Sequence, residues 1–389
     1  MTVTAPFTIR WGIISTGQIA TDFTQDLLVD PSLRGVSDVK HVVAAVGSRS
    51  VESATRFITK LKGAPTTDLW SWGVQQGMLD ETKALGSYQE VYNDSNVDII
   101  YIGTPVTHHH KDAKAALLAG KHVLCEKAFT FDVAELDELI AIAKEKNLFL
   151  MEAVWTRFHP ISYAIQDVLK SGVLGAPKRM QADFSIDFKV DNRPLSDRFL
   201  DAKLGGGGLL DMGPYPSVWA MLLLHQHPLN TKRVPPAFVN SYQRKYTKRG
   251  TNVDARSRWL LDFEELGCEA QLMTDMTCHG YKQGAVLLQC ENADLVIDYQ
   301  PQKPDTFRII PNDGSDATVK ASTHHVPIPA ELGHGLHFEA DEVARCIRDG
   351  KIESERMPLS ESRIVQSWFD DVRKNGTTDL KDMKGTAGL

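Results

Sequence analysis

Residues 7–23 read FTIRWGIISTGQIATDF, and this stretch decides the fold. Its first half, Phe7 to Ile14, is a short β-rich run that stops at Ser15-Thr16-Gly17, and helical spacing begins at Gln18. A strand, a tight turn and a helix in this order direct backbone N–H groups at a helix N-terminus toward one point, where negative charge is favoured. The stretch therefore predicts the first βα unit of a dinucleotide-binding sheet.

The same alternation continues to Arg157. Apolar runs at 41–47, 97–102, 122–126 and 149–155 alternate with helical stretches at 51–61, 111–119 and 133–146. Strands that alternate with helices of this length are typical of a parallel sheet covered on both faces. The segment from Lys62 to Lys83 interrupts the pattern, and we interpret it as an insertion.

Beyond Arg157 the pattern changes to successive strands without crossover helices, which indicates an antiparallel sheet. A chain of 389 residues also favours two hydrophobic cores over one. We predict an α/β Rossmann dinucleotide-binding domain at 1–157 and a substrate-binding α+β domain with an open, mainly antiparallel sheet at 158–389. Its expected strands are 179–188, 256–263, 268–276, 285–290 and 293–299, and the helices expected after Arg157 are 161–170, 214–224, 338–348 and 360–374.

The composition excludes several classes of protein. Hydrophobic residues make up 42% and charged residues 24%, so the chain folds, and a net charge of -7 without a basic tract argues against nucleic acid. Five cysteines without a CxxC pair suggest neither disulfides nor a thiolate zinc site, and no apolar segment approaches the ~20 residues of a membrane span. We expect a cytoplasmic protein without a metal, since the adjacent histidines at 108–110 and 324–325 lack the spacing of ligands on one helix face.

The first turn and the second strand predict the cofactor. Gly17 would let a pyrophosphate approach the backbone, although Ser15 replaces the first glycine of the G-x-G-x-x-G fingerprint, and a plain strand-to-helix turn is an alternative. The second strand ends in Gly47-Ser48-Arg49-Ser50, without the acid that binds an adenosine 2'-hydroxyl. Arg49 could instead bind a 2'-phosphate, which favours NADP; the alternative is a solvated surface arginine.

Two further segments predict the reaction centre. Glu126 and Lys127 follow a buried strand at the edge where open α/β sheets bind ligands. The run Gly205 to Gly208 precedes Asp211 and Tyr215, which are four positions apart and would share a helix face. A lysine cation beside a tyrosine lowers the phenol pKa, so Tyr215 could take a hydroxyl proton while hydride leaves the same carbon. The alternative is that Tyr215 packs in the core and Asp211 caps a helix.

Over nearly its whole length the chain resembles the glucose-fructose oxidoreductase and inositol dehydrogenase family (Gfo/Idh/MocA). The resemblance rests on WGIISTGQIA at 11–20, GSRS at 47–50, YIGTP at 101–105, GKHVLCEK at 120–127, MEAVWTRF at 151–158, the glycine run with its Asp and Tyr, and FEADEVA at 338–344. It implies Lys127, Asp211 and Tyr215 as catalytic residues. We expect NADP to be bound by Ser15, Thr16, Gly17, Gln18, Ile19, Ser48, Arg49, Thr104, Pro105, His108, Glu126, Lys127, Trp155 and Arg157.

One position departs from the family pattern. Ala128 stands where the family's Glu-Lys-Pro motif has a proline, whose preceding peptide bond is typically cis. A cis bond before a non-proline residue is costly, so either this turn is trans or its surroundings hold it cis.

The branch that looks most similar contains fungal NADP-dependent D-xylose dehydrogenases and dimeric dihydrodiol dehydrogenases. The resemblance implies oxidation of the anomeric carbon of D-xylose or a related aldose to the aldonolactone, with hydride transfer to NADP. Alternatives are a trans-1,2-dihydrobenzene-1,2-diol dehydrogenase and, in another class, a non-catalytic NADP-binding transcriptional regulator. It also implies a homodimer formed through the exposed face of the second sheet.

Overall fold

The computed structural model describes residues 5–63, 77–247, 250–314 and 319–376. Two compact units divide the chain. Unit 1 contains residues 1–130, 134–155 and 328–362, and unit 2 contains 131–133, 156–327 and 363–389. The predicted boundary after Arg157 lies two residues from the division at 155/156, whereas 328–362, expected in the second domain, packs with unit 1.

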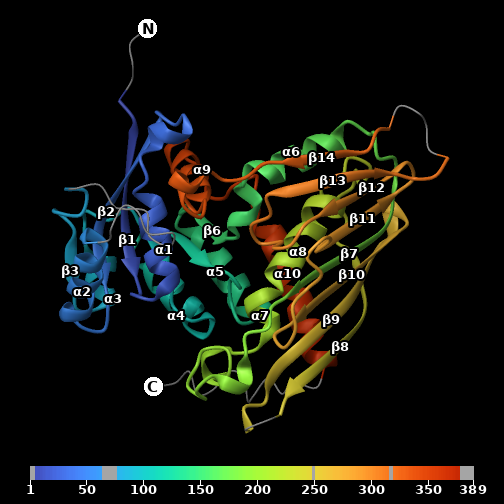
Figure 1. Cartoon of the computed structure of the whole chain (residues 1–389). Helices are drawn as coiled ribbons and strands as arrows, with labels where there is room; N and C mark the ends of the chain where they lie inside the picture. The colour runs from blue at the N-terminus through green and yellow to red at the C-terminus, as the bar shows by residue number, and fades with distance from the viewer. Residues whose placement is uncertain (1–4, 64–76, 248–249, 315–318, 377–389) are drawn as a thin grey trace. The chain divides into compact units, whose positions relative to one another are not determined.

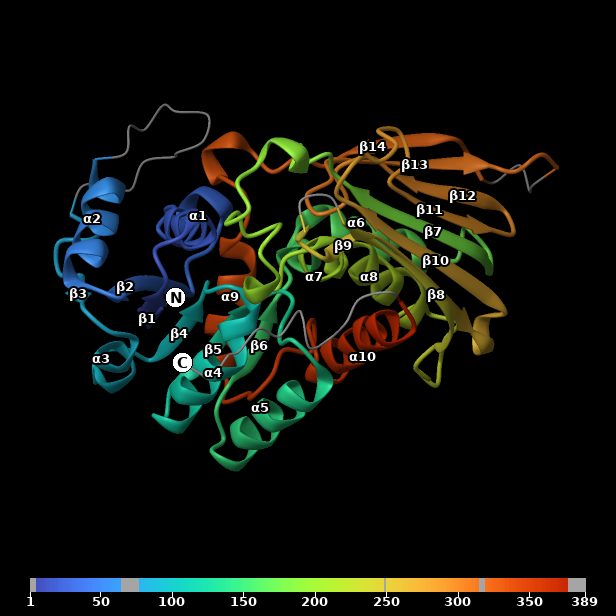
Figure 2. The ribbon, with the colours of Figure 1, turned by 90° about the horizontal axis from the view of Figure 1, so that it is seen from below.

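Unit 1, whose strands β1 to β3 are labelled in Figure 1, is built on a six-stranded parallel sheet. The strand order is β3-β2-β1-β4-β5-β6, as Figure 2 shows, so the order of the strands along the chain reverses between β1 and β4. In open sheets of this kind, ligands bind outside the carboxyl ends of the strands at that reversal. The strands are β1 Phe7–Ile14, β2 Val39–Gly47, β3 Lys83–Leu85, β4 Ile99–Ile102, β5 His122–Glu126 and β6 Leu150–Ala153. The helices are α1 Gln18–Leu27, α2 Val51–Lys62, α3 Tyr88–Asn93, α4 Val106–Leu118, α5 Val133–Glu145 and α9 His337–Arg348.

Apolar side chains of α3, α4 and α5 pack against one face of this sheet, where Ile100, Ile102 and Val123 are fully buried. On the other face the rings of Phe23 in α1 and Tyr101 in β4 stack at 3.8 Å. The predicted doubly covered parallel sheet is confirmed. The insertion predicted at 62–83 falls largely outside the described residues.

Helix α9 is fixed to this sheet by a buried polar chain. The Trp11 indole N–H donates to His41 Nδ1 at 3.1 Å, and His41 Nε2 donates to Asp341 Oδ1 at 2.9 Å. Both oxygens of Asp341 also accept from the Arg34 guanidinium at 2.8 Å, and the two side chains of this pair are 2% and 3% exposed. The charged partners hold the pKa of Asp341 far below its usual value against the opposing effect of burial.

Unit 2 contains an eight-stranded sheet in the order β14-β13-β12-β11-β7-β10-β9-β8. All neighbouring pairs are antiparallel except β7 and β10, so the expected open, mainly antiparallel sheet is confirmed. The strands are β7 Pro177–Ser185, β8 Ala237–Tyr246, β9 Val253–Phe263, β10 Cys268–Asp275, β11 Val286–Cys290, β12 Ala293–Ile297, β13 Thr306–Pro311 and β14 Ser322–His325. The helices are α6 Pro160–Lys170, α7 Gly208–Met212, α8 Pro214–Ala220 with a π-helical turn Met221–His225, and α10 Leu359–Asn375, which begins in unit 1.

One face of this sheet is covered by helices, as the second view shows (Figure 2). Along β10, Cys268, Ala270 and Leu272 are buried, whereas the alternating residues Glu269 and Gln271 are exposed. Strand geometry sends alternate side chains to opposite faces, so the second face of the sheet is open. No helix in the described ranges combines the length and hydropathy that a membrane crossing requires.

Candidate active site

The turn between β1 and α1 leaves room for a ligand at a helix N-terminus. Gly17 is the N-cap of α1, which has no side-chain cap. A Cβ added at Gly17 would meet a single neighbour, Ser15 Oγ at 3.4 Å. Ser15 itself has a φ of +89°, in the left-handed region that favours glycine, and its hydroxyl accepts from the Gly17 N–H at 3.2 Å. Uncapped N–H groups beside an open glycine fit the phosphates of a dinucleotide.

The residues that flank this turn lie at the same sheet edge. Thr16 Oγ1 lies 3.4 Å from Ser53 Oγ in α2, and the Gln18 amide donates to Asp22 at 2.7 Å. After β2, Ser48 is buried and Arg49 is exposed, with no partner for its guanidinium among the described residues. Since β2 runs parallel to β1, Arg49 follows its strand at the edge where the α1 turn begins.

The end of β4 brings in Thr104, Pro105 and the exposed His108 in the first turn of α4. The neighbouring His109 is buried instead. Its Nε2 lies 2.7 Å from the Thr104 carbonyl oxygen, and its Nδ1 lies 2.9 Å from that of Ala128. Burial lowers the pKa of His109 to about 4, so its neutral ring has one N–H and donates to one of these two carbonyl oxygens.

Glu126 is the last residue of β5, and two hydrogen bonds hold its carboxylate. The Tyr101 hydroxyl donates to Glu126 Oε1 at 2.8 Å, and the Lys127 N–H donates to Oε2 at 3.3 Å. The peptide bond between Lys127 and Ala128 is cis, which answers the question left open by the missing proline. Lys127 is partly exposed at the carboxyl end of β5, where the sequence placed it.

Two more buried carboxyl groups lie behind this turn, and the sequence analysis did not identify either. Glu152 Oε1, from β6, accepts from the Phe129 N–H at 3.1 Å. Glu339, from α9, is fully buried, and neither of its oxygens has a hydrogen-bond partner among the described residues. Burial, and then the charges of Glu126 and Asp26, raise the pKa of Glu339 well above its usual value.

The remaining predicted cofactor residues follow β6. Trp155 is half-buried in unit 1, and its ring meets that of His334 edge-on at 6.2 Å. Arg157 belongs to unit 2 and is 1% exposed.

In unit 2 the glycine run allows three stretches of backbone to come together. A Cβ at Gly206 would lie 2.9 Å from the carbonyl oxygens of Arg198, Phe199 and Asp201. A Cβ at Gly207, whose φ is +115°, would lie 2.1 Å from Asp254 Oδ1. These contacts explain why side chains are excluded here.

Asp254 fixes the start of α7. Its Oδ2 accepts from the Leu209 N–H at 2.7 Å and from the Ser257 hydroxyl at 3.1 Å, and the side chain is fully buried. Asp254, from β9, therefore caps the start of α7.

Asp211 and Tyr215 lie one turn apart. The backbone stays helical through Gly213, whose N–H donates to the Leu209 carbonyl at 2.8 Å. Asp211 Oδ1 accepts from Arg198 at 2.9 Å, and Tyr215 is 8% exposed with its ring edge-on to Phe184 at 5.1 Å. Lys127 belongs to unit 1, whereas Asp211 and Tyr215 belong to unit 2.

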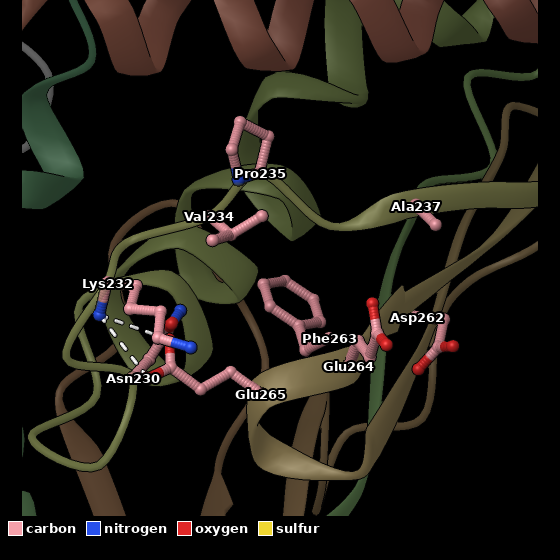
Figure 3. Close-up of a pocket in the computed structure, with 9 residues that line it drawn as sticks. All are labelled: Asn230, Lys232, Val234, Pro235, Ala237, Asp262, Phe263, Glu264 and Glu265. Atoms are coloured by element: carbon pink, nitrogen blue, oxygen red, sulfur yellow. Dashed lines mark hydrogen bonds between the residues drawn. The ribbon is translucent and has the colours of Figure 1, made fainter.

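Unit 2 also has a pocket of about 440 Å³ where β8 and β9 meet the loop before β8 (Figure 3). Glu265 closes one side by accepting from the Lys232 N–H at 3.1 Å and the Thr231 hydroxyl at 2.8 Å. None of the predicted site residues lines it, so it is separate from the candidate active site.

Two family models match the chain, one in its N-terminal part and one in its C-terminal part. Residues 9–154 match the family model described as "Oxidoreductase family, NAD-binding Rossmann fold", and residues 163–296 match the "GFO/IDH/MocA C-terminal domain". The chain is 35% identical to a D-xylose 1-dehydrogenase (NADP(+)) from Hypocrea jecorina over 97% of both chains. It is 30% identical to the trans-1,2-dihydrobenzene-1,2-diol dehydrogenase of Homo sapiens over 94% of this chain and 96% of that one.

Solved structures share the fold. A levoglucosan dehydrogenase in complex with NADH and levoglucosan superposes with a TM-score of 0.76 at 18% identity, covering 95% of this chain and 96% of that one. A 3-ketoreductase from Actinomadura kijaniata in complex with NADP and TDP-benzene gives a TM-score of 0.72 at 24% identity, covering 95% and 98%.

Proposed function

Because the chain belongs to the Gfo/Idh/MocA oxidoreductase family, we propose that it is an NADP-dependent D-xylose 1-dehydrogenase. It is an oxidoreductase that acts on CH–OH groups with NADP as coenzyme. The observation that carries the finer proposal is the 35% identity over 97% of both chains with a D-xylose 1-dehydrogenase (NADP(+)).

The proposed coenzyme site is the carboxyl edge of the unit 1 sheet. The uncapped N-terminus of α1 would hold the pyrophosphate, and the exposed Arg49 would pair with the 2'-phosphate. Trp155 and Arg157 are proposed to contact the coenzyme as well. The remaining proposed contacts are Ser15, Thr16, Gly17, Gln18, Ile19, Ser48, Thr104, Pro105, His108, Glu126 and Lys127.

In the proposed reaction, the sugar loses a proton from its anomeric hydroxyl and a hydride from C1, and so becomes the aldonolactone. NADP, when bound, supplies the hydride acceptor. Tyr215 takes the proton, Asp211 orients the sugar through its hydroxyl groups, and the Lys127 ammonium favours the phenolate form of Tyr215. The supporting geometry is the one-turn spacing of Asp211 and Tyr215 and the position of Lys127 after β5.

A panel assay tests the substrate. NADP reduction at saturating coenzyme is followed with D-xylose, D-glucose and benzene dihydrodiol, and we expect the largest kcat/KM with D-xylose. A higher value with the dihydrodiol would assign the chain to the activity named for its 30% identical relatives. NADP binding without turnover of any alcohol would favour the regulator.

Two variants test the residue roles. Tyr215→Phe should lower kcat by about a hundredfold or more, the usual contribution of a general base, at nearly unchanged KM for NADP. Arg49→Ala should raise the KM for NADP far more than that for NAD. Normal turnover in the first variant, or equal effects on both coenzymes in the second, would remove the residue from its role.

We also propose that the chain forms a homodimer through the open face of the unit 2 sheet. That face carries the half-buried or exposed apolar side chains of Tyr242, Leu260, Met273, Leu287 and Ile310, which a partner would cover. Light scattering should give twice the mass of 43.2 kDa, and Leu287→Arg should reduce it to one chain. A single-chain mass for the unmodified protein would contradict the proposal.

A further inference from the structure

Arg198 is a surface residue that is nevertheless held in one position. Its side chain is 60% exposed, and its Nη1 donates to Asp211 Oδ1 at 2.9 Å. The guanidinium carbon also lies 4.0 Å from the centre of the buried Phe199 ring. The ion pair and the cation–π contact together restrict a group that would otherwise sample many rotamers.

The backbone of Arg198 is held by the glycine run. The Gly207 N–H donates to the Phe199 carbonyl at 3.0 Å, and the Gly206 N–H donates to that of Asp201 at 3.0 Å. The Arg198 carbonyl oxygen lies 2.9 Å from the position that a Cβ of Gly206 would take. The same glycines that start α7 therefore hold Arg198 beside Asp211.

The charge of Arg198 acts on both members of the proposed pair. Its pKa is raised first by the negative charge of Asp211, and Tyr215 adds to the rise. Because Asp211 lies one turn from Tyr215, removing Arg198 takes a cation away from this carboxylate, and a carboxylate charge near a phenol disfavours the phenolate.

We propose that Arg198 is a positioning residue of the reaction site, which holds the Asp211 carboxylate and supplies positive charge that favours ionisation of Tyr215. This inference deepens the proposed function and rests on its assignment of Tyr215 as the base. It predicts that the pKa of Tyr215 depends on the positive charge of Arg198 and not on the packing of Arg198 against Phe199.

The chain offers a matched control. Arg193 also stacks on the Phe199 ring, at 4.9 Å, but its Nη1 donates to Asp197 Oδ2 at 2.8 Å and not to Asp211. Replacing Arg193 with Gln removes a guanidinium from the same aromatic cluster without removing the partner of Asp211. Arg198→Lys keeps the charge and is the conservative variant.

The experiment measures the ionisation of Tyr215 directly. Full-length protein labelled with [ζ-¹³C]tyrosine is titrated by NMR, and Tyr215→Phe identifies one resonance among the nine tyrosines. We expect Arg198→Gln to raise the pKa of Tyr215 by about one unit, since loss of a nearby cation typically shifts a pKa by this amount. Arg198→Lys and Arg193→Gln should leave it near the wild-type value, and circular dichroism checks that each variant is folded.

An unchanged pKa in Arg198→Gln, or an equal shift in Arg193→Gln, overturns the inference. The titration needs no substrate, so it is independent of the panel assay. A shifted Tyr215 in a protein that oxidises no alcohol supports the electrostatic role of Arg198 and refutes the proposed function, whereas an unshifted Tyr215 in an active dehydrogenase does the reverse.

Discussion

Gly207→Ala should destabilise unit 2 and displace the proposed reaction site. At a φ of +115° an alanine costs about 1–2 kcal/mol. The new Cβ would lie 2.1 Å from Asp254 Oδ1, so this buried carboxyl must move and give up its bond to the Leu209 N–H. Losing that buried bond costs about 1–3 kcal/mol, which makes a total of about 3 kcal/mol. Urea unfolding followed by circular dichroism measures the loss.

The neighbouring Gly208 is the control. It has no positive φ, and the atom nearest to an added Cβ is the flexible end of Met212 at 3.1 Å. Gly208→Ala should change the free energy of unfolding by less than about 1 kcal/mol. Because α7 carries Asp211, Gly207→Ala should also lower kcat about tenfold or more at an unchanged KM for NADP. A loss of stability below about 1 kcal/mol, or equal effects of the two alanines, would refute the role given to the close approach of Gly207 and Asp254.

Three further predictions concern buried polar groups of unit 1. The pKa of Glu339 is raised in the fold, so its contribution to stability falls as pH rises above about 4.5, the value for the unfolded chain. Glu339→Gln should flatten this decline in unfolding free energy. His109, with a pKa of about 4 in the fold, has the opposite sign: about 3 kcal/mol of stability is lost as pH falls from about 6.5 to 4, and His109→Gln should remove this loss in urea titrations at each pH. Asp341→Asn leaves Arg34 buried without its charge partner and should cost about 3–5 kcal/mol in the same assay, whereas Asp349→Asn, at a surface pair, should change little. A pH dependence identical to wild type, or equal costs of the two asparagines, would contradict the respective prediction.

Periodicity predicted the central elements because burial dictates their composition. The strand at 122–126 matches β5 in full, and the helix expected from residue 51 begins there as α2, where the Ser50 hydroxyl accepts from the Ser53 N–H at 3.2 Å. The edge strands of the unit 2 sheet do not show this alternation of buried apolar and exposed polar residues. Along β8 only Gln243 and Tyr246 are buried, and β14 has four residues without a buried side chain, so neither shows an apolar alternation.

Candidate site residues were predicted where a motif marks them, at the α1 turn, at Lys127 and after the glycine run. Arg198 and Glu339 were missed because their positions depend on contacts distant in sequence. Arg198 is one of several charged residues in a polar stretch, and only the approach of the Gly206 backbone places it at Asp211. Helical spacing predicted α9 but could not predict its partners, since an amphipathic pattern does not say which sheet the helix covers.

The return of residues 328–362 to unit 1 has a consequence for biosynthesis. While the ribosome is still making the chain, Arg34 and His41 emerge roughly 300 residues before Asp341, the acid that pairs with them. The nucleotide-binding unit therefore cannot complete its fold until nearly the whole polypeptide has been translated. A product truncated after residue 327 would retain every strand of that half and still expose the surface that α9 covers, which would make it a target for chaperones and proteases.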